Sequence, residues 1–227
     1  MRLNKKYILF DMDGTITDSK PGILNSMRHA MRSFGVEIPD SELESYAFFL
    51  GPPLRDSFRA LKTKFGLDNM SEEAAVAKYR EYYVPTGMFE NSLYPGIEEL
   101  LKSLKNSGKI IILATSKAEK YAKMILERFK ISNYFDLTVG SELDGRRSDK
   151  SEVILYALNQ YGLVSPEKKQ QAVMIGDRNH DIIGAAAAGI TSVGVLYGYG
   201  SLEELTAGEY KAGYTAKDAA GLAGILL

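Results

Sequence analysis

Two pairs of aspartates stand where short apolar runs of this sequence end. Asp11 and Asp13 directly follow the apolar residues 7–10, and Gly14 comes next. Alternate residues of an extended strand lie on one side, so both carboxylates are predicted to share a face. Gly14 then lets the chain turn sharply away. Because buried charge is costly without compensation, and ligands bind beyond the carboxyl ends of parallel strands, this segment predicts a ligand site.

A calcium-binding loop also begins with two aspartates one residue apart. Such a loop needs Gly at its sixth position and Glu at its twelfth. Counted from Asp11, those positions are Ile16 and Gly22. The sequence therefore excludes this type of calcium site.

A second apolar run, at residues 172–175, leads into Gly176 and Asp177, and Asp181 follows four residues later. Residues 182–188 are rich in small side chains and predict a helix. Two strands that each end in carboxylates can surround one hard cation with oxygen atoms. Mg²⁺ accepts such ligands together with water and substrate phosphate, so the pattern predicts a magnesium site.

Two further segments carry groups that suit a phosphate. The predicted strand at 110–113 leads to Thr115 and Ser116, whose hydroxyls and following N–H groups could hold phosphate oxygens. Lys150 precedes a predicted helix at 152–161 and could supply a positive charge to the same site. A single lysine at a helix start carries little weight by itself, because most lysines are solvated.

Taken in order, these four pieces resemble the four motifs of the haloacid dehalogenase (HAD) superfamily. The matching residues are DxDGT at 11–15, Thr115, Lys150 and GDRxxD at 176–181. The surrounding stretches FDMDGTITDS and GDRNHDIIGAAAAGI are similar to the phosphoglycolate-phosphatase-like branch, which has a helical cap. The resemblance extends over nearly the whole chain.

The resemblance implies a role for each acidic residue. Asp11 would be the nucleophile that becomes an aspartyl phosphate, and it would also ligate the metal. Asp13 would be the general acid and base, and its backbone carbonyl would contact the metal. Asp177 would ligate Mg²⁺ directly, with Asp181 ligating through water or holding the ligand shell.

The remaining motif residues would bind the substrate. The resemblance implies that Thr115 and Lys150 hold the transferring phosphoryl group, with Lys150 also steadying Asp11, and Ser116 is a further candidate for binding its oxygens. An acid two residues after the nucleophile suits ester cleavage, because an alkoxide needs a proton and a halide does not. We therefore expect phosphate chemistry rather than dehalogenation.

The order of helical and extended patterns predicts an α/β fold with two domains. Strand and helix patterns alternate after residue 94, which predicts a doubly wound parallel sheet with a Rossmann-like HAD core. Residues 17–88 show helical patterns alone, at 22–34, 41–49, 54–65 and 71–83. We expect a core domain from residues 1–16 and 89–227 and an inserted all-helical cap domain at 17–88.

Two segments are less easily interpreted. Gly51, Pro52 and Pro53 predict a stiff turn before a helix, and Arg55 follows. Arg55 either contacts the substrate from the cap or is a surface residue of a helix, and the sequence favours neither. Residues 198–213 could cover the edge of the site, but no firm interpretation follows from them.

The composition limits the classes of partner. The chain has 28 Lys and Arg against 29 Asp and Glu, a net charge of −1, so it predicts no general attraction to nucleic acid or membranes. It has no cysteine, and no apolar run reaches transmembrane length or suits a signal peptide. We expect a cytoplasmic protein, monomeric or homodimeric, whose partner is a small phosphorylated metabolite.

Three functions agree with this sequence. The first is a Mg²⁺-dependent phosphatase acting on a small phosphomonoester such as phosphoglycolate, a sugar phosphate or a nucleoside monophosphate. The second is an intramolecular sugar phosphomutase similar to β-phosphoglucomutase, since such isomerases share the four motifs. The third, a non-catalytic binding or regulatory protein, is disfavoured by the complete set of motifs.

Overall fold

A six-stranded parallel sheet forms the centre of the computed structural model, which describes residues 2–227. Its order is β5-β4-β1-β6-β7-β8. The strands are β1 (Tyr7–Phe10), β4 (Ile110–Ala118), β5 (Leu137–Ser141), β6 (Ala172–Gly176), β7 (Thr191–Val195) and β8 (Tyr214–Ala216). This topology confirms the predicted α/β class with a doubly wound parallel sheet.

Strand β1 lies between β4 and β6, and its position explains where the predicted site forms. Phe10, the last residue of β1, is opposite Leu113 of β4 and Ile175 of β6. All four residues of β1 are buried, which accounts for their continuous apolar character. The chain leaves β1 at the point where strand order reverses, the usual ligand position in such sheets.

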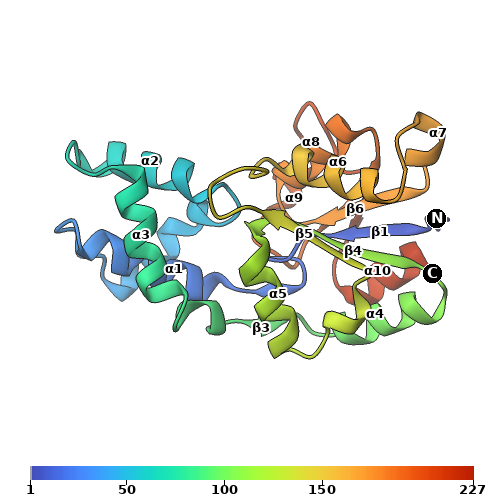
Figure 1. Cartoon of the computed structure of the whole chain (residues 1–227), viewed down its shortest axis with the longest axis horizontal. Helices are drawn as coiled ribbons and strands as arrows, with labels where there is room; N and C mark the ends of the chain where they lie inside the picture. The colour runs from blue at the N-terminus through green and yellow to red at the C-terminus, as the bar shows by residue number, and fades with distance from the viewer. Residues whose placement is uncertain (1) are drawn as a thin grey trace. The chain divides into compact units, whose positions relative to one another are not determined.

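Helices cover both faces of the sheet (Figure 1). On one side lie α6 (Lys150–Gln160) and α8 (Asn179–Ala188), and on the other lie α4 (Ile97–Asn106), α5 (Glu119–Arg128) and α10 (Ala219–Leu226). Val153, Ile154 and Ala157 of α6 pack with Leu9 of β1 and Ala185 of α8 in one buried cluster. Shorter elements are η3 (Ser132–Tyr134), α7 (Pro166–Lys169) and α9 (Leu202–Thr206).

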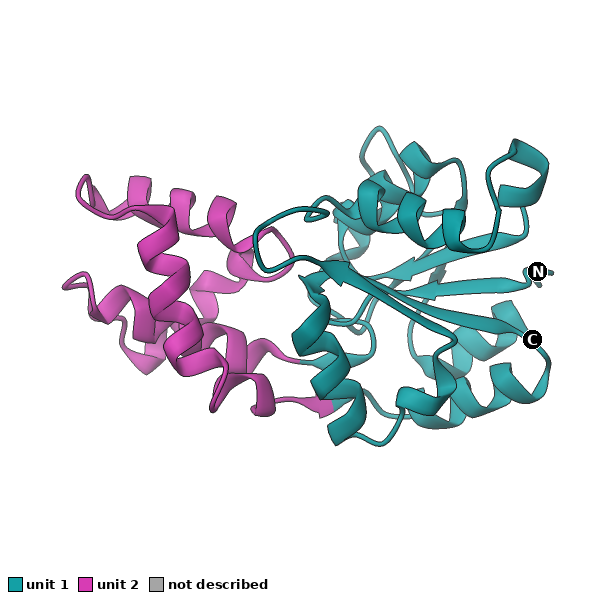
Figure 2. Ribbon diagram, viewed as in Figure 1, with its two compact units in different colours: residues 1–18, 93–227 teal, residues 19–92 magenta. Residues whose placement is uncertain are grey.

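The chain divides into two compact units, coloured separately in Figure 2. The first contains residues 1–18 and 93–227, and the second contains residues 19–92. These divisions lie two and four residues beyond the predicted boundaries after residues 16 and 88. The difference arises at two short paired strands, β2 (Thr17–Asp18) and β3 (Ser92–Leu93), where the chain passes between the units.

The regular structure of the second unit is helical except at Ser92, which begins β3. It contains α1 (Lys20–Arg32), η1 (Asp40–Phe49), α2 (Leu54–Phe65), α3 (Glu72–Tyr83) and η2 (Gly87–Phe89). Phe49, Phe58 and Tyr79 form a buried aromatic group with ring centroids 5.1–6.1 Å apart. These aromatic residues therefore supply much of the unit's own core.

Several elements differ from the sequence-based expectation. Segment 41–49 forms a 3₁₀ helix interrupted at Tyr46 instead of an α-helix. Strand β8 and helix α10 were not predicted, because β8 has three residues and α10 is apolar on nearly all sides. Among residues 2–227, no helix combines the length and apolar character needed to cross a membrane.

Candidate active site

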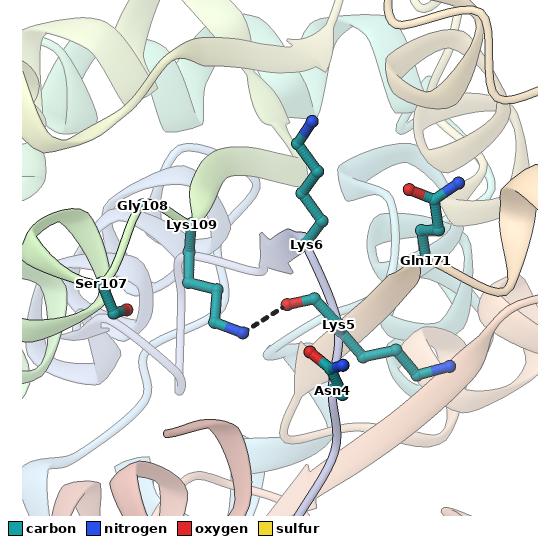
Figure 3. Close-up of a pocket in the computed structure, with 7 residues that line it drawn as sticks. All are labelled: Asn4, Lys5, Lys6, Ser107, Gly108, Lys109 and Gln171. Carbon is teal, nitrogen blue, oxygen red and sulfur yellow. Dashed lines mark hydrogen bonds between the residues drawn. The ribbon is translucent and has the colours of Figure 1, made fainter.

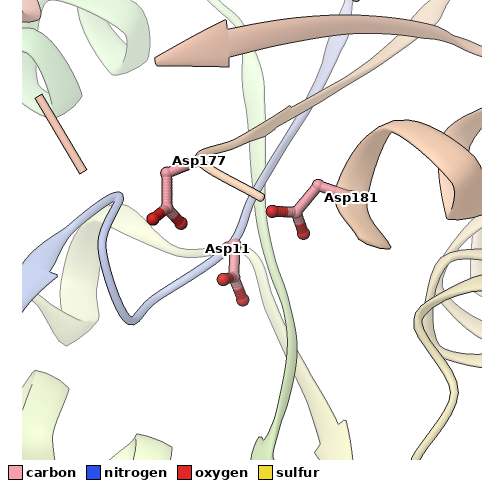
Figure 4. Close-up of side chains that lie close together, drawn as sticks. All are labelled: Asp11, Asp177 and Asp181. Atoms are coloured by element: carbon pink, nitrogen blue, oxygen red, sulfur yellow. The ribbon is translucent and has the colours of Figure 1, made fainter. Parts of the chain in front are cut away.

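Three buried carboxylates meet at the carboxyl edge of the sheet (Figure 4). Asp11 follows β1, Asp177 follows β6, and Asp181 lies in the first turn of α8. One oxygen from each residue lies within 4.8 Å of the others. The fold therefore brings together three of the four aspartates that the sequence assigns to the metal.

Burial of these carboxylates favours a bound cation, which would stabilise their charged forms. Asp11 is 8% exposed and Asp177 is fully buried, so their charged forms are poorly solvated. Burial raises the pKa of Asp11 to about 6, with Lys150 opposing the rise and Asp181 adding to it. Burial, followed by the charges of Asp181 and Asp11, also raises the pKa of Asp177 well above its ordinary value. A hard divalent cation fits this set of oxygen donors.

Lys150 lies between two of these carboxylates. Its Nζ is 2.7 Å from Oδ1 of Asp11 and 2.8 Å from Oδ1 of Asp181. Burial would lower the pKa of Lys150, but the charges of Asp11 and Asp181 outweigh it and raise that pKa. Gly184 of α8 allows the close packing, since a Cβ there would lie 2.8 Å from Cγ of Lys150. The lysine is thus a fixed cation against the predicted nucleophile.

Asp13 has a different neighbour. Its Oδ2 lies 2.8 Å from Nζ of Lys117, and the two side chains are 15% and 7% exposed. The carboxyl group of Asp13 is not part of the three-carboxylate group and pairs with Lys117 instead. Contact of its backbone carbonyl with a metal stays a prediction.

Sequence analysis did not identify Lys117 as a site residue. The residue follows Thr115 and Ser116 directly, and this position after a strand was the available signal. A lysine just after a predicted strand is most often solvated, so the sequence alone does not distinguish Lys117 from a surface residue, although the structure places it in β4.

Thr115 and Ser116 lie inside β4 (Ile110–Ala118), whereas the sequence predicted them to follow a strand at 110–113. Thr115 is 1% exposed near the end of β4, and its Oγ1 accepts a hydrogen bond from the N–H of Lys117 at 3.2 Å. Lys150 donates to the carbonyl of Ala114 at 3.2 Å, which links β4 to the predicted nucleophile Asp11 through the lysine. Ser116 is partly exposed beside Thr115. Phosphate binding by Thr115 and Ser116 stays a prediction.

Arg55 belongs to the second unit. It lies in the first turn of α2, its side chain is 54% exposed, and its Nη1 is 2.7 Å from Oε1 of Glu73 on α3. The ion pair links two helices of the same unit. Substrate contact by Arg55 stays a prediction.

The predicted metal ligand Asp177 is held by two hydrogen bonds. Its Oδ1 accepts from Oγ1 of Thr15 at 3.3 Å, and its Oδ2 accepts from the N–H of Tyr199 at 2.7 Å. Gly14 has a φ of +83°, and a Cβ there would lie 2.1 Å from Oδ2 of Asp177. The turn after β1 therefore needs glycine both for its backbone conformation and for the space that Asp177 occupies.

A separate hollow of about 360 Å³ lies at the opposite, amino-terminal edge of the sheet. Nζ of Lys109 donates to the carbonyl of Lys5 at 2.8 Å, and Nζ of Lys5 donates to the carbonyl of Gln170 at 2.6 Å. Figure 3 shows the lysine amino groups pointing in different directions. The lining residues are Asn4, Lys5, Lys6, Ser107, Gly108, Lys109 and Gln171. This hollow lacks the convergent groups that distinguish the carboxyl edge.

Comparison with known proteins agrees with the geometry. A family model described as haloacid dehalogenase-like hydrolase matches residues 8–195. A 5'-nucleotidase of Pseudomonas aeruginosa is 41% identical over 200 residues, which cover 88% of this chain and 86% of that protein. The crystal structure of a predicted phosphatase from Clostridium acetobutylicum has a TM-score of 0.87 and 42% identity, with 97% of each chain covered.

Other relatives carry different names. The tyrosine-protein kinase PtkA of Mycobacterium tuberculosis is 43% identical over 195 residues, which cover 86% of this chain and 63% of that protein. A phosphoglycolate phosphatase of Aquifex aeolicus is 30% identical over 194 residues, 86% of each chain. The protein belongs to the haloacid dehalogenase-like hydrolase family, as its motifs predicted, and it is an enzyme of the phosphatase type.

Proposed function

We propose that this protein is a Mg²⁺-dependent phosphatase that hydrolyses a small phosphomonoester through an aspartyl phosphate on Asp11. The observation that carries the proposal is that one oxygen from each of Asp11, Asp177 and Asp181 lies within 4.8 Å of the others, with Lys150 held against Asp11. An anionic nucleophile must approach an anionic phosphate. Fixed positive charge at that point removes the repulsion that would otherwise oppose attack.

In the first step, a carboxylate oxygen of Asp11 forms a bond to phosphorus while the bond to the ester oxygen breaks. Asp13 gives its proton to the departing alkoxide. Lys150 and the hydroxyl of Thr115 hold the phosphoryl oxygens as they change position. Asp11 and Asp13 follow β1, Thr115 lies in β4 and Lys150 begins α6, so the sheet and its helices set their spacing.

In the second step, the ionised Asp13 accepts a proton from water, and the water oxygen attacks phosphorus. The bond between phosphorus and Asp11 breaks, and inorganic phosphate leaves. Asp13 is then protonated again and Asp11 is again a carboxylate. Lys117, at 2.8 Å from Asp13, keeps that carboxylate in place for both transfers.

Asp11, Asp177 and Asp181 would hold the magnesium ion. When bound, Mg²⁺ supplies positive charge that offsets the carboxylates and the phosphoryl group and orients the two toward each other. The raised pKa values of Asp11 and Asp177 support this assignment, because they show carboxylates whose charge is not fully compensated by the protein alone.

A nucleoside 5'-monophosphate is the first substrate class to test. The relative named 5'-nucleotidase is 41% identical over most of its length, compared with 30% for the phosphoglycolate phosphatase of Aquifex aeolicus. We place phosphoglycolate and sugar phosphates next, in line with the second name and with the sequence-based expectation.

The experiment is a measurement of phosphate released from nucleoside 5'-monophosphates, phosphoglycolate and hexose phosphates in Mg²⁺. We expect turnover of at least one class, its loss on chelation, and poor replacement of Mg²⁺ by Ca²⁺, whose coordination is looser. The variant Asp11→Asn is the matched control. Conversion of a hexose 1-phosphate to its 6-phosphate without phosphate release would instead identify a mutase, and unchanged rates in a chelator would remove the metal from the proposal.

A further inference from the structure

The segment at 197–200, Tyr-Gly-Tyr-Gly, lies directly against the predicted metal ligand Asp177; we call it the tyrosine strap. A Cβ at Gly198 would lie 2.3 Å from Cβ of Asp177 and 2.3 Å from the carbonyl oxygen of Gly14. A Cβ at Gly200 would lie 2.0 Å from the carbonyl oxygen of Asp177. Both glycines are therefore required by close backbone approach to Asp177.

Three hydrogen bonds connect the tyrosine strap to the residues around the nucleophile. The N–H of Tyr199 donates to Oδ2 of Asp177 at 2.7 Å. Its hydroxyl donates to Oδ1 of Asp18 at 3.2 Å. The hydroxyl of Tyr197 donates to the carbonyl of Thr15 at 3.0 Å. The strap thus contacts the segment that follows β1 at two points and Asp177 at a third.

Packing keeps the tyrosine strap in position. The ring of Tyr197 lies 4.8 Å from that of Tyr94, centroid to centroid, with the planes tilted by 57°. Burial raises the pKa of Tyr197, and the charge of Asp177 raises it further, so this hydroxyl stays a neutral donor. A tyrosine that is anchored at both its ring and its hydroxyl fixes its own backbone and that of its neighbours.

These contacts leave Asp177 with capacity for a cation. Each carboxylate oxygen has two acceptor positions, and the structure shows one hydrogen bond to each, from Thr15 and from Tyr199. Groups that hydrogen-bond to a metal ligand set its orientation, and their loss commonly weakens metal binding by 10-fold to 100-fold. The strap has the position and the donors for that task.

We propose that the tyrosine strap orients Asp177 for the divalent cation, with Tyr197 and Tyr199 acting as positioning residues. The proposal rests on the cation site of the proposed function, but it does not depend on which substrate the enzyme takes. The hydroxyls of both tyrosines hold the strap on the segment after β1, and the N–H of Tyr199 then holds the carboxylate.

The test uses Tyr197→Phe and Tyr199→Phe, which remove only the hydroxyl oxygen and keep the glycines and the rings. Tyr210→Phe is the matched control, because Tyr210 is 47% exposed and outside the strap. Binding of Mn²⁺ to the full chain without substrate is measured by electron paramagnetic resonance, with Mg²⁺ as competitor. We expect each strap variant, and the double variant, to bind Mn²⁺ on the order of tenfold more weakly than the parent protein. The control variant should bind Mn²⁺ with the affinity of the parent protein.

A second measurement separates positioning from general loss of structure. For a positioning role, the Mg²⁺ concentration that gives half-maximal turnover rises in the strap variants, and saturating Mg²⁺ restores kcat to the parent value. Parent-like Mn²⁺ affinity in the double variant would overturn the proposal, and so would a loss of kcat that no Mg²⁺ concentration restores. A parent protein that binds Mn²⁺ but hydrolyses none of the phosphate esters would refute the proposed function and leave this inference standing.

Discussion

Nζ of Lys150 lies 2.7 Å from Oδ1 of Asp11, although the two residues are 139 positions apart in the sequence. The pair forms because β1 and the start of α6 meet at the same edge of the sheet. Both side chains are buried. Burial raises the pKa of Asp11, and the ammonium of Lys150 opposes that rise by stabilising the carboxylate. Asp11 can then be an anion that attacks phosphate while a cation remains beside it.

Replacing Lys150 by methionine tests this relationship. Lys150→Met should lower kcat/KM on the order of 10²-fold to 10³-fold, the usual cost of removing one preorganised donor to a charged transition state. It should also destabilise the metal-free protein by roughly 3–5 kcal/mol, because two buried carboxylates lose their partner. Steady-state kinetics and denaturant unfolding measure the two effects.

Lys168→Met is the control for Lys150→Met. Lys168 is exposed on α7, and its replacement should change stability by less than about 0.5 kcal/mol. Equal losses of kcat/KM and of stability in Lys150→Met and Lys168→Met would show that the position of Lys150 has no special importance.

Gly14→Ala tests the close contact between the turn after β1 and Asp177. The added Cβ would lie 2.1 Å from Oδ2 of Asp177, so it should displace the metal ligand as well as strain the backbone. Gly108→Ala is a matched control, since Gly108 has a similar φ of +77° and open space around its Cβ position. We expect both variants to lose stability, and Gly14→Ala alone to lose Mn²⁺ binding. Similar Mn²⁺ affinities would contradict the contact.

Stability without metal should depend on pH through Asp11. Its pKa of about 6 in the folded protein lies above the ordinary 3.8, so folding strengthens proton binding. This contribution to stability is fully present below pH 3.8 and is lost as pH rises through 6. The shift corresponds to about 3 kcal/mol.

In the proposed function, Mg²⁺ would replace the proton as the partner of Asp11. It should therefore raise the unfolding temperature more at pH 7.5 than at pH 5, where a proton must first be displaced. Calorimetry in chelator and in Mg²⁺ at both pH values measures the difference, and an identical increase at both would contradict it.

The sequence predicted the elements whose signals are local. Residues 7–10 were predicted as a buried strand and form β1, and the helices at 54–65 and 97–106 have the predicted limits. The aspartates were found because acidic residues directly after apolar strands are unusual. Their roles, however, came from resemblance to a family and not from spacing.

What the sequence could not provide depends on tertiary structure. Lys117 resembles a solvated loop lysine until the fold places it against Asp13. The tyrosine strap had no interpretation, because its two glycines are explained only by the position of Asp177, more than twenty residues earlier in the chain. Substrate contact by Arg55 also stays a prediction, because no local pattern records how that residue relates to the site.

The most direct test of the central claim is to find the phosphoryl group on Asp11. Asp13→Asn should accumulate the aspartyl phosphate from nitrophenyl phosphate, because this leaving group needs no proton while the attacking water still needs a base. After acid quenching, peptide mass spectrometry should locate one phosphate on Asp11, and Asp11→Asn should show none and no turnover. Phosphate on another residue, or turnover by Asp11→Asn, would contradict the account.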